Sequence, residues 1–499
     1  MEISVVYSRA LAGIQAPLVH VETHLSNGLP AFNIVGMPAT TVRESKERVR
    51  SALLNSHFSF PDRHITINLA PADLPKEGGR FDLPIALGIL AASGQLPQEQ
   101  LQAHEFLGEL ALDGSLRPIP SVISAAREAA MAKRSLAIPA SCAQLAAHVP
   151  NCRVIAADDI LTLCAHLNGN CTIEPSVLVA DTTRVCYLDL DEIVGQQMAR
   201  RALEIAASGG HNLLFFGPPG TGKTLLASRL PGILPPPSPA EALTGLAVRS
   251  FYNSTECSEY LKRPFRRPHH SASQAALVGG GSIPRPGEVS LAHGGVLFLD
   301  ELPEFTRPSL EALREPMESG EITLSRANHK TTYPAQFQLV AAMNPCPCGY
   351  AGDRDRTCHC TPDQVQRYRQ RISGPLLDRI DLHIDVPRVA ASALLNNDCS
   401  GEPSARVRAR VCSSRKRQIL RQGCANALLP STEIANACLL ERPQKNYIES
   451  AATEMALSSR SVHRTLRVAR TIADLAEATA ISNEHIGEAL AYRSREPGQ

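Results

Sequence analysis

The fold of this chain is decided by the stretch Gly217-Pro218-Pro219-Gly220-Thr221-Gly222-Lys223-Thr224, which follows the apolar run Asn212-Leu213-Leu214-Phe215-Phe216. A glycine-rich loop between a buried strand and a helix turns several backbone N–H groups toward one point, where phosphate oxygens bind. Lys223 can then reach the β- and γ-phosphates, and the Thr224 hydroxyl can coordinate Mg²⁺. Because every fixed position of the motif is filled, we predict a site for ATP and Mg²⁺ rather than an ordinary turn.

Two further strands supply the polar groups that such a loop needs. The run 295–299 is apolar and too short for a core helix, so we interpret it as a central parallel strand followed by Asp300 and Glu301. Asp300 would hold Mg²⁺, and Glu301 would act as general base on the attacking water. Another apolar strand, 337–343, delivers Asn344 to the same edge, where its amide could orient that water. An asparagine at a strand end is often only a turn residue, but behind a complete phosphate loop we favour the catalytic role.

Length and composition predict a large multidomain protein. The 499 residues exceed what one hydrophobic core supports, so two to four domains are expected. No apolar stretch approaches the roughly 18 residues of a membrane span, and the N-terminus lacks a basic leader region. We therefore expect a cytoplasmic protein without a membrane partner. The 14 cysteines are scattered, which favours reduced thiols over a disulfide framework.

The pattern of elements divides the chain into four parts. An α+β region at 1–175 precedes a linker at 176–192, an α/β P-loop ATPase core at 193–387 and a helical lid at 388–499. The lid is predicted from successive helical runs at 390–395, 405–422, 431–440, 444–456, 461–478 and 483–492.

Three signature stretches resemble those of a known family. They are Pro71-Ala72-Asp73-Leu74-Pro75-Lys76-Glu77-Gly78-Gly79-Arg80-Phe81-Asp82-Leu83-Pro84, Arg267-Pro268-His269-His270-Ser271-Ala272-Ser273 and Gly374-Pro375-Leu376-Leu377-Asp378-Arg379-Ile380-Asp381-Leu382. In this order they are similar to the magnesium chelatase-like AAA+ proteins of the YifB/ComM type. The resemblance covers the whole chain and implies a Lon-protease-like N-terminal domain fused to a chelatase-type AAA+ core and lid. It also implies a homo-oligomeric ring, a hexamer, that couples ATP hydrolysis to movement on single-stranded and branched DNA, with branch migration during natural transformation as its role.

Two arginines are candidates for stabilising the transition state of hydrolysis. Arg379 resembles the finger that a ring neighbour contributes in trans, and removal of such a finger typically costs a factor of about 10³ or more in rate. An intramolecular ion pair with Asp378 or Asp381 is the alternative. In the lid, Arg460 resembles the second sensor arginine at the start of a helix expected to face the nucleotide. Arg464, one turn later, is the competing candidate.

The N-terminal region lacks the Ser/Lys dyad of a Lon peptidase. When 75–80 is laid on the Lon segment that contains the nucleophile, Arg80 stands where serine should. The segment 108–119 matches the one before the Lon lysine, and the aligned position is Ile123, which cannot activate a nucleophile. We therefore predict a non-peptidase domain that shapes the ring or contacts DNA.

A candidate zinc site is formed by Cys346, Cys348, Cys358 and Cys360. Two pairs of thiols on either side of the turn 349–353 could close a tetrahedral S₄ site on Zn²⁺. However, one residue separates the cysteines of each pair where structural zinc sites usually have two or more, and His359 is an alternative ligand. A loop of free thiols is the competing interpretation. A zinc ion here would be structural and would lie near Asn344.

DNA contacts must come from local basic features, because a net charge of +1 provides no global attraction. A hairpin predicted at 321–333 places Arg326, His329 and Lys330 near its turn, where they could grip phosphates in the pore of a ring. A solvated hairpin tip is the alternative.

Two other basic segments are weaker candidates for DNA contact. The glycine-rich insert at 278–287 carries Arg285, and the run 406–421 holds the densest positive charge. Such a run is usually a solvated helix face, although it would also suit a duplex path.

Two functions other than a DNA motor compete for these residues. The ATPase subunit of a metal chelatase shares the core, but the fused N-terminal domain and the absence of a porphyrin-binding domain count against it. A protein-remodelling AAA+ ring is the third possibility.

Overall fold

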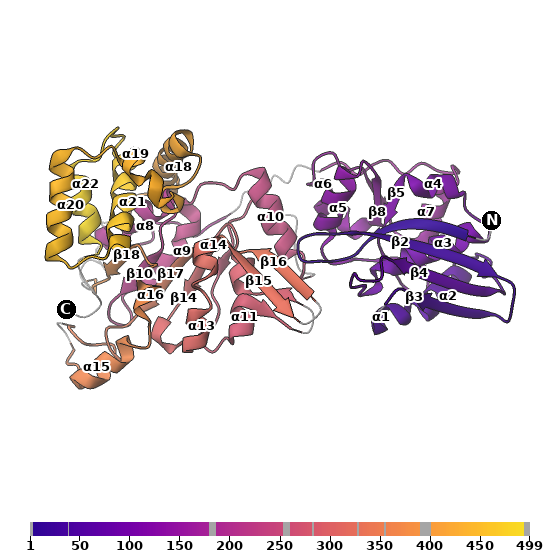
Figure 1. Cartoon of the computed structure of the whole chain (residues 1–499), viewed down its shortest axis with the longest axis horizontal. Helices are drawn as coiled ribbons and strands as arrows, with labels where there is room; N and C mark the ends of the chain where they lie inside the picture. Colours follow the sequence, from indigo (N-terminus) through magenta and orange to yellow (C-terminus); the bar gives the residue numbers. More distant parts are fainter. Residues whose placement is uncertain are drawn as a thin grey trace. The chain divides into compact units, whose positions relative to one another are not determined.

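The computed structural model describes residues 3–37, 39–178, 186–252, 260–281, 284–326, 329–353, 356–389 and 401–493. Two compact units make up the chain (Figure 1). The first comprises Met1–Thr183, Pro239–Tyr260 and Ser325–Tyr333, and the second comprises Arg184–Ser238, Leu261–Leu324 and Pro334–Gln499. The phosphate loop lies in the second unit.

The first unit contains a seven-stranded mixed sheet in the order β3-β4-β2-β1-β5-β8-β9. β1 pairs with β2 and β2 with β4 in antiparallel fashion, whereas the other neighbours run parallel. β2 and β4 alternate between buried and more exposed side chains, as expected of strands with one face on a core. The strands are β1 (Ile3–Arg9), β2 (Leu18–Ser26), β3 (Ala31–Val35), β4 (His64–Ala70), β5 (His104–Phe106), β8 (Ser135–Pro139) and β9 (Val154–Ala157).

Helices and a small two-stranded sheet accompany this sheet in the first unit. Every residue of α3 (Asp82–Ala92) is buried, because this helix is apolar on all sides after its first residue. The remaining elements are α1 (Thr40–Arg43), α2 (Ser45–Asn55), α4 (Gln98–Gln102), β6 (Glu109–Leu110), β7 (Leu116–Arg117), α5 (Val122–Met131), α6 (Ala143–Ala147) and α7 (Ile160–Leu167).

Two segments from the sequence interval 193–387 belong to the first unit. α10 (Pro239–Arg249) places Leu246 and Ala247 in the same apolar cluster as residues of α5 and α6. The tip of the hairpin formed by β15 (Glu321–Arg326) and β16 (His329–Pro334) also belongs there, and its Tyr333 packs edge-on against Phe251. Apolar side chains far from the N-terminus therefore complete this unit. Its first segment ends at Thr183, inside the predicted linker 176–192, but residues 239–260 and 325–333 of the predicted ATPase core also belong to it.

The second unit is built on a five-stranded parallel sheet in the order β11-β14-β17-β10-β18. Its strands are β10 (Leu213–Phe216), β11 (Phe265–Arg266), β14 (Val296–Leu299), β17 (Gln338–Met343) and β18 (Leu382–Asp385). All residues of β14 and β17 are buried, as in parallel sheets covered on both faces. The predicted α/β class with a parallel-sheet core is thereby confirmed. Because the strands are parallel, residues 217, 300 and 344 all lie at the carboxyl ends of the strands, on the same side of the sheet.

Helices surround this sheet. Those preceding the C-terminal region are α8 (Gln197–Gly209), α9 (Lys223–Ile233), α11 (Gln274–Val278), α12 (Glu288–Leu291), α13 (Arg307–Glu311), α14 (Pro316–Ser319), α15 (Pro362–Arg369) and α16 (Gly374–Leu377). A short antiparallel pair, β12 (Gly279–Gly280) and β13 (Arg285–Pro286), lies within the glycine-rich insert.

The C-terminal region is helical (Figure 1). It contains α18 (Ser404–Gln422), α19 (Ile434–Cys438), α20 (Arg442–Glu454), α21 (Ser459–Leu475) and α22 (Asn483–Ala491). Val411 of α18 and Ile472 of α21 share one apolar cluster with Phe215 of the sheet, so these helices and the sheet have a common core. The run predicted at 431–440 is shorter than expected, since it opens with a 3₁₀ turn. The helix predicted at 390–395 lies outside the described residues.

Candidate functional site

The phosphate loop joins the end of β10 to the start of α9, as its glycines require. Gly220 and Gly222 have φ angles of 78° and 87°, values that other residues rarely adopt. A Cβ atom on Gly217 would lie 2.4 Å from the carbonyl oxygen of Val386. Within the loop, the Thr221 hydroxyl donates a hydrogen bond to the Pro218 carbonyl at 3.0 Å. The loop is thus closed on itself at a point where larger side chains would not fit.

Lys223 is folded over the loop and is largely buried. Its Nζ atom donates hydrogen bonds to the carbonyl oxygens of Gly217 and Pro218 at 2.6 and 2.8 Å, and to Oδ1 of Asn344 at 3.1 Å. Burial lowers the pKa of Lys223 to about 8, although the carboxylates of Asp300 and Glu301 act in the opposite direction. Because the ammonium is poorly solvated here, a bound phosphate would stabilise its charge.

The predicted magnesium ligands, Thr224 and Asp300, are also together. The Thr224 hydroxyl donates a hydrogen bond to Oδ2 of Asp300 at 2.8 Å. The same carboxylate oxygen accepts a hydrogen bond from Nη2 of Arg267 at 2.7 Å. A hydroxyl and a carboxylate are ligands that suit Mg²⁺. A cation bound at Oδ2 of Asp300 would compete with Arg267 for this oxygen.

Glu301 stands in a strained backbone conformation at the open side of the site. Its φ angle is 53°, in the left-handed region, and its side chain is 53% exposed. Nδ1 of His270 lies 3.3 Å from Oε2 of Glu301. From the sequence, Arg267 and His270 were recognisable only as members of a signature stretch. Their position directly after β11, the neighbour of β14, is the signal that could have assigned them to this site.

The segment that carries Asn344 is held by α15. Arg369 donates hydrogen bonds from Nε and Nη2 to the Pro345 carbonyl at 3.4 and 3.3 Å. Burial, together with the carboxylates of Glu304 and Glu301, raises the pKa of Tyr368 to about 12, and a hydrogen bond with the Asn344 backbone opposes this. Sequence reasoning missed Tyr368 and Arg369, because nothing local to α15 indicates their partners.

Arg379 lies at the amino ends of the parallel strands, whereas the phosphate loop of its own chain follows their carboxyl ends. Its carbonyl accepts a hydrogen bond from Nδ2 of Asn212 at 3.0 Å, and Asn212 immediately precedes β10. The four residues of β10, at about 3.3 Å each, separate its amino end from its carboxyl end by roughly 13 Å. The guanidinium is buried and its Nη2 pairs with Oε1 of Glu318 at 2.5 Å, so its partner is neither Asp378 nor Asp381.

Arg460 meets the same carboxylate as Arg379. Its Nη2 atom forms an ion pair with Oε1 of Glu318. The competing candidate, Arg464, pairs instead with Oδ1 of Asp381 at 2.6 Å. The structure therefore brings the two predicted arginines together, but it does not bring Arg460 to the phosphate loop of its own chain.

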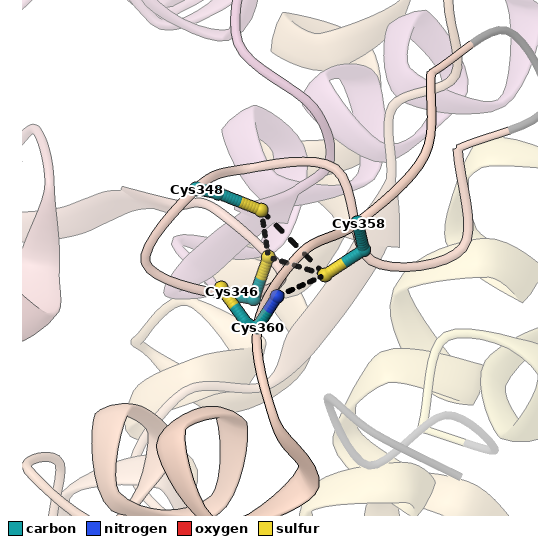
Figure 2. Close-up of side chains that lie close together, drawn as sticks. All are labelled: Cys346, Cys348, Cys358 and Cys360. Atoms are coloured by element: carbon teal, nitrogen blue, oxygen red, sulfur yellow. Dashed lines mark hydrogen bonds between the residues drawn. The ribbon is translucent and has the colours of Figure 1, made fainter.

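The four predicted zinc ligands converge in the loop between β17 and α15 (Figure 2). The Sγ atom of Cys346 lies 3.3 Å from that of Cys348 and 3.6 Å from that of Cys358, and the latter two are 3.5 Å apart. With Cys360 included, all four sulfur atoms lie within 4.8 Å of one another. Four thiolates around a tetrahedral zinc at about 2.3 Å would be about 3.8 Å apart. This donor set therefore fits zinc without His359.

The candidate DNA contacts are only partly described. Lys330 and Arg285 are exposed, as a phosphate contact requires. The side chains of Arg326 and His329 lie outside the described part of the chain. In the basic run of α18, Arg410 pairs with Glu204 and Glu402, and Arg421 pairs with Asp474. Much of this positive charge therefore stabilises the second unit.

In the first unit, Arg80 is buried and contacts the segment just before Ile123, the second position that was aligned with the Lon dyad. Its Nη2 atom donates a hydrogen bond to the carbonyl of Pro120 at 2.7 Å, and Ile123 follows within the buried start of α5. Burial lowers the pKa of Arg80 to about 10. An arginine and an isoleucine at these positions provide neither nucleophile nor base.

Among the described residues, no helix is both long enough and apolar enough to cross a membrane.

Comparison with known proteins places this geometry in a family. Three family profiles match: "Magnesium chelatase, subunit ChlI" over residues 189–394, "Subunit ChlI of Mg-chelatase" over 21–141 and "Magnesium chelatase, subunit ChlI C-terminal" over 401–493. They cover the sheet with the phosphate loop, much of the first unit and the C-terminal helices.

Full-length relatives extend the match. The competence protein ComM of Haemophilus influenzae is 52% identical, covering 99% of this chain and 98% of its own. The YifB protein of Salmonella typhimurium is 50% identical, covering 99% and 97%. A more distant relative, the Holliday junction branch migration complex subunit RuvB of Saccharopolyspora erythraea, is 29% identical over 31% of this chain and 38% of its own. The chain therefore belongs to the YifB/ComM family of magnesium chelatase-like AAA+ ATPases.

Proposed function

We propose that this protein is a ring-forming ATPase that moves on DNA and promotes branch migration of recombination intermediates during natural transformation. The observation that carries the ATPase part is the group formed by Lys223, Thr224, Asp300 and Asn344 at one edge of a parallel sheet, with Glu301 beside it. The DNA part is supported by the relatives, one a competence protein and one a branch migration subunit.

In the proposed reaction, the backbone of residues 217–222 and the Lys223 ammonium bind the phosphates of ATP. Thr224 and Asp300 would hold Mg²⁺, which neutralises charge on the β- and γ-phosphates when bound. Glu301 accepts the proton of the attacking water, and the Asn344 amide orients that water. In the described conformation Arg267 contacts Asp300 and His270 contacts Glu301, so these side chains compete with Mg²⁺ and with the attacking water for the two carboxylates.

The ring is proposed because one chain does not complete this site. Arg379 lies at the opposite edge of its own sheet, roughly 13 Å of strand away from the loop. A neighbouring subunit could bring its Arg379 to the γ-phosphate, with its Arg460 beside it. A hexamer of identical chains is the assembly that we propose.

The proposed partners are single-stranded and branched DNA. Lys330, Arg326, His329 and Arg285 are proposed to contact phosphates, because DNA binding by a chain of nearly zero net charge requires local basic groups. The first unit would then support the hairpin tip that carries three of these residues, since this tip belongs to it.

The chelatase alternative rests on the descriptions of the matching profiles. The full-length match to a competence protein favours the DNA motor instead.

One set of assays separates these functions. ATP hydrolysis is measured alone and with single-stranded DNA, forked DNA, a porphyrin or an unfolded protein, followed by movement of a labelled three-strand junction. We expect stimulation by DNA and ATP-dependent junction movement. Stimulation by the porphyrin or the unfolded protein, without any by DNA, would contradict the proposal.

A further inference from the structure

The loop between β17 and α15 that carries the four cysteines, called the cysteine loop below, packs against the phosphate loop. Gly349 lies between the two pairs of cysteines, with a φ angle of 86°. A Cβ atom at this position would lie 2.7 Å from Cδ and 3.1 Å from Cγ of Pro219. Real Cβ atoms do not approach other atoms so closely, which means that the Gly349 backbone and the Pro219 ring are in direct contact. The shape of one loop therefore limits the shape of the other.

The cysteine loop is also continuous with the segment that carries Asn344. Cys346 follows Asn344 by two residues, and Oδ1 of Asn344 accepts the hydrogen bond from Lys223. After Cys360, the side chain of Thr361 caps α15. From that helix Arg369 returns to the Pro345 carbonyl. The loop is thus connected at both ends to the residues around Asn344.

Within the loop, the thiols are the groups that draw the chain together. The backbone N–H of Ala351 donates to Sγ of Cys346 at 3.3 Å, and that of Cys360 donates to Sγ of Cys358 at 3.4 Å. Cys346 is buried and the other three thiols are half-buried. Closing a loop of this length costs conformational entropy, and a metal bound by both pairs of cysteines would offset that cost.

We propose that Cys346, Cys348, Cys358 and Cys360 bind one Zn²⁺, and that the cysteine loop with zinc bound holds Pro219 and Asn344 in the geometry that binds nucleotide. The zinc is structural, because all four positions of a tetrahedron are taken by sulfur and none remains for water. Gly349 acts as a positioning residue, since it touches the phosphate loop and not the nucleotide. The inference rests on the ATP site proposed above.

Two glycines of the loop provide a matched pair for testing the contact. Gly352 has a φ angle of 77°, and a Cβ atom there would meet nothing within 4 Å. Alanine at either position imposes a similar left-handed backbone strain. Only Gly349→Ala also forces the loop away from Pro219. A difference between the two variants therefore reports the contact and not the strain.

The experiment measures zinc content by atomic emission and affinity for a fluorescent N-methylanthraniloyl ATP analogue with Mg²⁺. Wild type and Gly352→Ala should contain about one zinc per chain and bind the analogue alike. Gly349→Ala should keep its zinc but bind about tenfold or more weakly, because the phosphate loop is displaced. Cys348→Ser with Cys358→Ser should lose both zinc and affinity. Circular dichroism checks the folding of each variant. If the double variant does not fold, the zinc content of wild type decides the metal site and the two glycine variants decide the contact.

Several results would overturn the inference. Absence of zinc from wild type purified without chelator would refute the metal site. A zinc-free double variant that binds the analogue as tightly as wild type would refute the role of zinc in nucleotide binding. Equal affinities of Gly349→Ala and Gly352→Ala would equally refute the contact. A wild type that contains zinc but binds no nucleotide would refute the proposed ATPase itself, which distinguishes the two failures.

Discussion

Lys223 donates a hydrogen bond to Oδ1 of Asn344 at 3.1 Å, although 121 positions separate the two residues. This bond joins the ammonium proposed to bind phosphate to the amide proposed to orient water. It exists because β10 and β17 are parallel neighbours in register, with Phe216 opposite Met343. A change at either residue is therefore expected to disturb the other.

The first prediction concerns the nucleotide site. Lys223→Ala should abolish binding of ATP, whereas Glu301→Gln should leave ATP bound and slow its hydrolysis by about 10²- to 10⁴-fold, because the base is lost and Asp300 is kept. Nucleotide binding and phosphate release measure the two effects. Glu304→Gln, a carboxylate three residues away that pairs with Arg371, is the control and should retain most of the turnover. Wild-type turnover by Glu301→Gln would show that the assigned base is wrong.

A second prediction tests the action of Arg379 across subunits. Arg379→Ala should lower hydrolysis by about 10³-fold or more, since the transition-state charge loses its partner. Mixing this variant with Glu301→Gln should restore some hydrolysis, because certain interfaces then combine an intact arginine with an intact base. Mixing it with a protein that carries both substitutions should restore none. Absence of rescue in the first mixture would argue against a role in trans.

The third prediction follows from the pKa of Lys223. Burial lowers this pKa from 10.5 to about 8, so between these values the folded protein holds fewer protons here than the unfolded chain. The buried ammonium therefore destabilises the fold below about pH 8, and this cost fades as the pH rises toward 10.5. ATP requires the charged form, so its affinity should fall above about pH 8, by up to about tenfold per pH unit.

The measurement is the affinity for the ATP analogue between pH 6.5 and 9.5. Lys223→Arg is the control, because a guanidinium stays charged throughout and its profile should be flat. An equally flat profile in the wild type would show that Lys223 does not titrate in this range.

The fourth prediction concerns Lys330 on the hairpin. If its exposed ammonium binds a phosphate, Lys330→Ala should weaken DNA binding and reduce the slope of log affinity against log salt by up to about one unit for each phosphate that is no longer neutralised. Lys445→Ala, which removes an exposed lysine from α20, should leave the slope unchanged. A hairpin that is only a solvated tip would give the same slope and the same rate of junction movement in all three proteins.

Local sequence patterns were sufficient to predict the strands and the loop that form the proposed nucleotide site. A Gly-rich loop after an apolar strand, and polar residues after two further strands, predict one site because the carboxyl ends of parallel strands share an edge. The structure adds what those patterns do not contain. Arg267 and His270 contact Asp300 and Glu301, and Tyr368 lies by Asn344, through pairings that depend on the order of the strands.

The sequence by itself determined the α/β core, the residues of the phosphate loop and the choice of four cysteines, because each is encoded by residue type and spacing over a few positions. Only the tertiary structure decided that Arg379 and Arg460 share Glu318 away from their own phosphate loop, and that the cysteine loop presses on Pro219. It also decided that the hairpin tip and α10 belong with the N-terminal unit. These relationships join residues far apart in the chain, and they arise from strand order and from the packing of apolar surfaces, which no local spacing records.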